Sequence, residues 1–186
     1  MGLDFVALLK CPPINEMDDP RIVSLEGGSP RAMQDAVAHF KTLRTDPIFY
    51  NREGWVVPVE FEDPVERPSA LTRQFAYRTR ESFELLFDRK TVYVRNWMRW
   101  LRFLKDKKSQ STMLEAIIDL GKLLQATDGI VTNDMSPVIV AFEQGRCFDE
   151  ALKAGTAKDG EVSTLDDLYE VDGEGTWDCH GYWRFL

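Results

Sequence analysis

Three adjacent residues near the C-terminal end, Asp178, Cys179 and His180, supply an acid, a thiol and an imidazole. Such groups form a nucleophilic site when a base removes the thiol proton. In an extended strand Asp178 and His180 point to one side and Cys179 to the other, so neighbours in sequence cannot activate each other. A catalytic site built on them needs residues from elsewhere in the fold, and Asp134, in a short connection between two apolar runs, is a further catalytic candidate. This combination defines one alternative function, a small hydrolase or nuclease-like enzyme that uses carboxylates with His180 or Cys179.

Other groups capable of chemistry have simpler structural interpretations. Asn133, Asp134 and Ser136 lie between two apolar runs, where these residue types commonly form turns through local hydrogen bonds. Asp88 and Lys90 have the spacing of the acid and lysine at one end of a nuclease site, but such a pair often arises by chance. None of these short patterns predicts a reaction by itself.

Motifs for metals and cofactors are missing from the sequence. The chain has no His-Glu-x-x-His, no Cys-x-x-Cys and no calcium-loop pattern. It also lacks the glycine spacings that cradle dinucleotides or nucleoside triphosphates, and the G-x-S-x-G turn of many acyl-transfer enzymes. We therefore expect neither a metal ion nor a cofactor.

The stretch from Arg89 to Lys108 carries eight basic residues and one acid, Asp106, in a chain whose formal net charge is -8. If this stretch is a helix, Arg95, Arg99 and Arg102 lie together on one side, opposite an apolar arc. Aligned like charges repel one another, so we expect an acidic group beside the three arginines. The protein's own excess of acid is the simplest source of that group.

The three arginines, together with Trp100 at the margin of the apolar arc, are the predicted binding residues. A module that binds nucleic acid or acts as a regulator through these arginines is a further alternative. The acidic balance of the remaining chain disfavours it, because a polyanion is repelled by most of such a surface.

The length and composition predict one folded domain. The chain has 186 residues, of which 44% are apolar and 29% are charged, close to the averages for globular proteins. We expect a single domain over residues 1–186, with a weak internal boundary at the proline-containing stretch 63–70. Three widely spaced cysteines and the absence of a leader or a long apolar run predict a cytoplasmic protein without disulfides or membrane spans.

Periodicity and turn residues predict the secondary structure elements. The expected elements are a strand at 3–9, a helix at 30–44, a strand at 55–61 with Pro58 at a sheet edge, a helix from 112 to about 124, strands at 130–132 and 138–142, a helix at 148–154 closed by Gly155, and a final strand within 177–186. A helix that begins at Pro137 competes with the strand at 138–142, and the segment 72–94 fits either type. The fold class is α+β, with helices packed on one face of a mainly antiparallel or mixed sheet.

The absence of catalytic spacings, the acidity and the aromatic content favour a protein that acts by binding another protein. The specific form of this hypothesis is a bacterial inhibitor or immunity-type protein that neutralises a toxin enzyme. A partner with a basic surface is expected, because opposite charges accelerate association.

Overall fold

A mixed β-sheet runs through the middle of the molecule. The computed structural model describes residues 3–14, 18–27, 30–42, 58–59, 75–78, 83–88, 90–156, 160–172 and 181–186. Within them the strand order is β2-β3-β4-β5-β1-β6-β8-β7, with every neighbouring pair antiparallel except β7 and β8. The strands are β1 (Asp4–Lys10), β2 (Pro58–Val59), β3 (Phe75–Arg78), β4 (Glu84–Asp88), β5 (Thr91–Arg99), β6 (Asp128–Asn133), β7 (Glu161–Val162) and β8 (Tyr182–Arg184).

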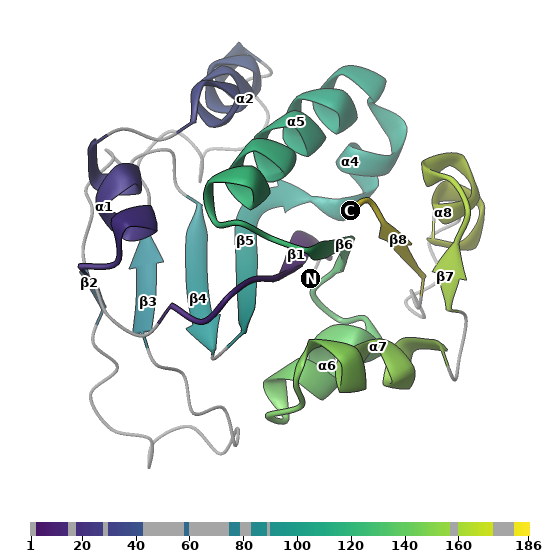
Figure 1. Ribbon diagram of the computed structural model, residues 1–186. Helices are drawn as coiled ribbons and strands as arrows, with labels where there is room; N and C mark the ends of the chain where they lie inside the picture. The colour runs from purple at the N-terminus through teal and green to yellow at the C-terminus, as the bar shows by residue number, and fades with distance from the viewer. Residues whose placement is uncertain are drawn as a thin grey trace.

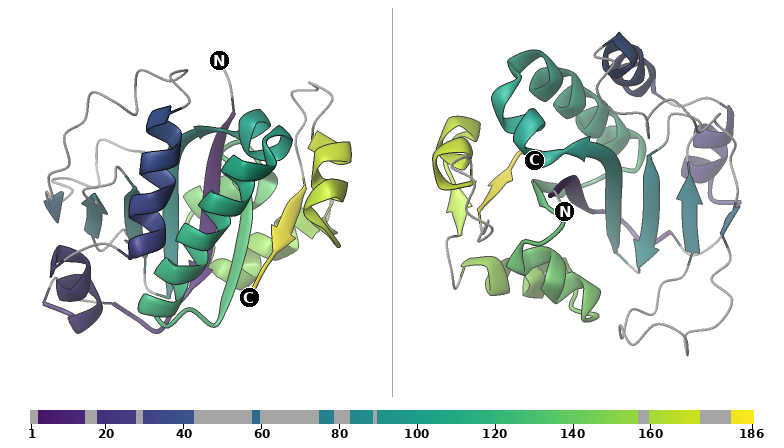
Figure 2. Two further views of the ribbon diagram at one scale, coloured as in Figure 1. Left: turned by 90° about the horizontal axis from the view of Figure 1, so that it is seen from above. Right: turned by 180° about the vertical axis from the view of Figure 1, so that it is seen from behind.

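Helices pack against this sheet in two layers (Figure 1). The helices are α1 (Pro20–Gly27), α2 (Arg31–Thr42), α4 (Trp100–Lys105), α5 (Lys107–Leu123), α6 (Pro137–Glu143), α7 (Phe148–Thr156) and α8 (Leu165–Asp172). Helices α2, α4 and α5 lie on one side of the sheet, and α6 and α7 lie on the other, as the views in Figure 2 also show. The predicted α+β class and mainly antiparallel mixed sheet are confirmed, and the second helical layer adds to the single covered face that we expected.

The central strand β1 explains why both faces are covered. Its residues from Phe5 to Leu9 are all 0% exposed, so it has no solvent-facing side. Because side chains alternate along a strand, Phe5, Ala7 and Leu9 enter the larger core, whereas Val6 and Leu8 enter the smaller core beneath α6 and α7. A continuous apolar run is the pattern of a strand buried on both faces.

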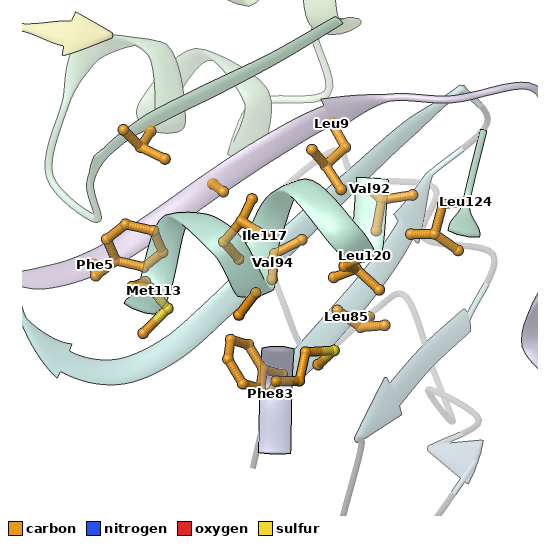
Figure 3. Close-up of a cluster of buried hydrophobic side chains, with 14 of the residues drawn as sticks. Phe5, Leu9, Phe83, Leu85, Val92, Val94, Met113, Ile117, Leu120 and Leu124 are labelled. Carbon is orange, nitrogen blue, oxygen red and sulfur yellow. The ribbon is translucent and has the colours of Figure 1, made fainter. Parts of the chain in front are cut away.

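The larger core forms between the sheet and α5. Figure 3 shows Phe5 and Leu9 from β1 beside Met113, Ile117 and Leu120 of the helix. These helical residues recur at spacings of three and four, so they form one apolar stripe. The helix is longer than predicted and begins at Lys107, because the Asp106 carboxylate accepts a hydrogen bond from the Lys108 amide and forms the N-cap.

The structure decides the type of two segments that the sequence left open. The segment 138–142 is helical, because Ser136 accepts a hydrogen bond from the Ile139 amide and Pro137 occupies the first turn. The segment 84–88 is a strand, although its spacing also suggested a helix. Gly155 lies inside α7 instead of ending it. A Cβ atom there would lie 2.3 Å from Val138 Cγ2, so the glycine permits close packing of α6 and α7.

Other predictions depend on where the described residues lie. Strand β1 and helix α2 match the expected strand at 3–9 and helix at 30–44 within a few residues. Pro58 is in the edge strand β2, as its missing amide donor predicted. Helix α1 is not among the elements that we expected from the sequence. The expected boundary at 63–70 lies outside the described residues.

Candidate functional site

A charge cluster lies where β1 begins and β5 ends. Asp4 is opposite Arg99 in the sheet register, and its side chain is 9% exposed. Asp4 Oδ1 accepts a hydrogen bond of 2.7 Å from Arg99 Nη1, and Asp4 Oδ2 accepts one of 3.4 Å from Arg95 Nη2. One nearly buried carboxylate therefore holds two guanidinium groups from the neighbouring strand.

The turn after β6 is attached to the same cluster by a reciprocal pair of hydrogen bonds. The Asp4 amide donates to Asp134 Oδ1 at 2.9 Å, and the Asp134 amide donates to the Asp4 carbonyl at 3.1 Å. Burial raises the pKa of Asp134, and the nearby negative charge of Asp4 raises it further. Asp134 thus positions the turn and carries a carboxyl group that gains a proton more readily than an exposed aspartate.

The neighbouring polar residues have the local roles that their types predicted. Asn133 is 0% exposed, and its Oδ1 accepts a hydrogen bond from the Met135 amide at 3.0 Å. Ser136 caps α6 as described above. These contacts fix the path of the turn and leave the Met135 side chain 63% exposed.

The basic segment differs from the helix that we predicted. Arg95 and Arg99 belong to β5, and the chain becomes helical only at Trp100. Arg102 is in α4 and does not join the two strand arginines at Asp4. Trp100 is 0% exposed, with its ring centroid 5.3 Å from that of Phe103. Its burial removes it from the predicted binding surface.

The proposed nucleophilic cluster can be assessed only in part. Asp178, Cys179 and His180 lie outside the described residues, and the fourth candidate, Asp134, contacts Asp4. The other imidazole, His39, is half-buried in α2, with Nε2 3.2 Å from Ser109 Oγ. The hydrolase or nuclease-like alternative therefore stays a prediction.

A concavity with a volume of about 200 Å³ lies at the opposite end of β1. It is bounded by the end of β1, the β4–β5 turn and the connection between α6 and α7. Its described lining residues are Lys10, Asp88, Lys90, Thr91, Gly145, Cys147, Phe148 and Asp149. Our sequence reasoning singled out only Asp88 and Lys90 from this set. Their position two residues apart, at a hairpin turn between apolar strands, is the signal that would have placed them together at a sheet end.

Two backbone features fix the walls of this concavity. The Cys11 amide donates to the Lys90 carbonyl at 2.8 Å, which joins the end of β1 to the hairpin. Helix α6 ends with amide-to-carbonyl hydrogen bonds from Gly145 to Phe142 and from Arg146 to Ala141, and Gly145 has a φ of 89°. This is the Schellman arrangement, which favours glycine at the left-handed position. The concavity is thus built into the fold.

The two described cysteines differ in environment. Cys11 is 3% exposed, and burial raises the pKa of its thiol to about 12. Cys147 is exposed at the rim of the concavity. Only Cys147 is therefore open to reagents in the described part of the folded chain.

The described residues contain no group of three or more histidine, cysteine or acidic side chains arranged to hold a metal ion. Among the same residues, no helix has the length and apolar character needed to cross a membrane. Comparison of the chain with protein-family models, with curated proteins and with solved structures found no match. The functional proposals therefore rest on the geometry at the two ends of β1.

Proposed function

We propose that the protein acts by binding another protein through the surface formed by Asp134, Met135, Val140 and Glu143, which we name the β6–α6 surface. The observation that carries this proposal is the exposure of two large apolar side chains in one short segment, Met135 at 63% and Val140 at 40%. Methionine is enriched at protein interfaces, where its flexible side chain adapts to a partner.

Carboxylates accompany these apolar side chains. Asp134 precedes Met135 directly, and Glu143 is three residues after Val140, a spacing that puts both on one side of a helix. The positive charges of Arg95 and Arg99 are already held by Asp4. An apolar contact with an acidic margin fits a partner that has an apolar recess and basic residues around it.

Arg95 and Arg99 help to hold the turn that carries this surface. They fix Asp4, and the Asp4 backbone and Asp134 fix each other through two hydrogen bonds. A turn held in one conformation loses little conformational entropy on association, which favours affinity. We therefore assign Arg95 and Arg99, which both bond Asp4, a positioning role.

The overall charge supports the same kind of partner. A formal net charge of -8 steers basic proteins towards the chain and accelerates their association at low salt. An inhibitor or immunity-type protein that neutralises a basic toxin enzyme in a bacterium is the specific form of the proposal. In that form the β6–α6 surface covers the toxin's active site or an essential region beside it.

Site-specific photocrosslinking in the native host tests the proposal. A photoreactive residue replaces Met135 in one variant and Leu101 in the control, because Leu101 is also an exposed apolar side chain, at 41%, but lies on α4 in the other helical layer. We expect one protein to be captured from position 135 and not from position 101. With that protein purified, its association rate should fall as salt rises, and Met135→Ser with Val140→Ser should weaken binding at least about tenfold.

Three results would reject the proposal. They are no specific capture from position 135, equal capture from both positions, and unchanged affinity of the purified partner for the Met135→Ser, Val140→Ser variant. The control substitution Leu101→Ser should leave that affinity unchanged.

A further inference from the structure

We propose that the concavity at the end of β1 binds a small zwitterion of the α-amino acid type. This inference does not depend on the β6–α6 surface, because the concavity is at the other end of the same strand. Its volume of about 200 Å³ is below the roughly 300 to 1,000 Å³ that is usual for larger ligands. A ligand of the size of a free amino acid suits that volume.

The charges on its walls define the ligand class. Lys10 Nζ bonds both carboxylate oxygens of Asp149, at 2.8 and 2.7 Å, so these two charges form an ion pair. Asp88 and Lys90 supply one further charge of each sign. A molecule with an ammonium and a carboxylate complements this second pair, whereas a simple anion or cation is opposed by one of its two members.

The two charges also lie at different depths. Asp88 is 6% exposed, and its carboxylate Oδ1 is buried. A carboxylate has room for about four hydrogen bonds, so Asp88 can accept an ammonium group in addition to its contacts within the protein. Lys90 is exposed at the rim and forms no ion pair with another described residue, which leaves its ammonium available for a carboxylate.

The remaining walls fit the rest of such a molecule. Thr91 is 3% exposed, lines the concavity and lies opposite Asp88 in the strand register, and its hydroxyl can donate to a carboxylate. Phe148 is 2% exposed and gives the concavity an apolar wall suited to a modest aliphatic side chain. The ligand is therefore expected to enter with its ammonium towards Asp88 and its carboxylate towards Lys90.

Calorimetric titration of the full chain with each common free α-amino acid tests this inference. We expect at least one of them to bind with a stoichiometry of one. Its deaminated acid and its decarboxylated amine should each bind at least about tenfold more weakly, because each lacks one of the two charges. Failure of every amino acid to bind at millimolar concentration, or equal binding by the acid or the amine, would overturn the inference.

Variants then place the bound ligand. Lys90→Gln removes an exposed charge without disturbing the core and should weaken binding at least about tenfold. The matched control is Lys105→Gln, an exposed lysine on α4 outside the concavity, and it should bind as the unchanged chain does. Equal affinities of the two variants would show that the amino acid binds elsewhere and would reject this site. The β6–α6 photocrosslinking result is independent of both outcomes, so the two proposals can fail separately.

Discussion

The two ends of β1 use charge in opposite ways. At Asp4 the nearly buried carboxylate bonds two arginines, and the Asp4 backbone bonds the turn after β6. At Lys10 one exposed ion pair stands beside a concavity whose other charged side chains border open space. Oppositely charged side chains that bond one another hold elements of the fold together, whereas charged side chains that line a concavity can also contact a ligand. The first end is therefore suited to supporting a surface, and the second to binding a small molecule.

The largest expected effect is in thiol chemistry at the Lys10 end, where Cys11 is buried and Cys147 is exposed at the rim of the concavity. In a Cys179→Ser background, we expect an alkylating reagent to modify Cys147 rapidly and Cys11 only on unfolding. The pKa of about 12 alone makes reaction of Cys11 at least about a thousandfold slower than that of an ordinary thiol. Mass spectrometry with and without denaturant measures both rates. Similar rates in the folded protein would contradict the assigned burial.

The next largest effect is expected from Asp4→Ala, which removes a carboxylate that bonds two arginines. We predict a loss of about 1.5 to 3 kcal/mol in the free energy of unfolding, because the removed carboxylate is 9% exposed and accepts charge-assisted hydrogen bonds from both arginines. Denaturant unfolding measures this value. A loss below about 0.5 kcal/mol would mean that the cluster does not hold the strand ends together.

A smaller effect with a characteristic pH dependence is expected at Asp134. Its pKa is raised in the folded protein, so the folded state binds more protons than the unfolded state between the two pKa values. This contribution to stability is complete below the unfolded pKa of aspartate and is lost as pH rises through the folded pKa. Asp134→Asn should remove that loss and add less than about 1 kcal/mol of stability at neutral pH.

Denaturant unfolding across the acidic range measures the contribution of Asp134. Asp106 provides the opposite control, because a hydrogen bond from Ser109 lowers the pKa of its carboxyl group. Its contribution is present above the unfolded pKa and is lost as pH falls through the folded pKa. If Asp134→Asn lost stability as pH rose in the same way as the unchanged chain, another group would be responsible.

The sequence predicted more of the charge cluster than of the concavity, and the reason is geometric. Residues four positions apart lie on one side of both a helix and a strand, so Arg95 and Arg99 point together although the predicted helix was wrong. Arg102 fits that group only on a helix, and the change from β5 to α4 separates it. The expected acidic counterpart is Asp4, which is remote in sequence but adjacent in the sheet.

The concavity depends on contacts that no local pattern contains. Lys10 and Asp149 are 139 residues apart, and their pairing requires β1 and α7 to meet. That meeting depends on α6, for which we favoured a strand over the competing helix that begins at Pro137. The Ser-Pro signal was outweighed by the β-branched residues that follow it, which favour strands when considered alone.

The smallest effect on the free energy of unfolding is expected at the Lys10 end. Asp149→Asn breaks an ion pair whose two side chains are 34% and 57% exposed, so we predict a loss of less than about 1 kcal/mol in the free energy of unfolding. The removed Asp149 carboxylate is 57% exposed, whereas the Asp4 carboxylate is 9% exposed. If Asp149→Asn cost as much as Asp4→Ala in the same denaturant experiment, the Lys10 pair would also be structural. The two ends of β1 would then differ in the space beside their charges and not in how firmly those charges hold the fold.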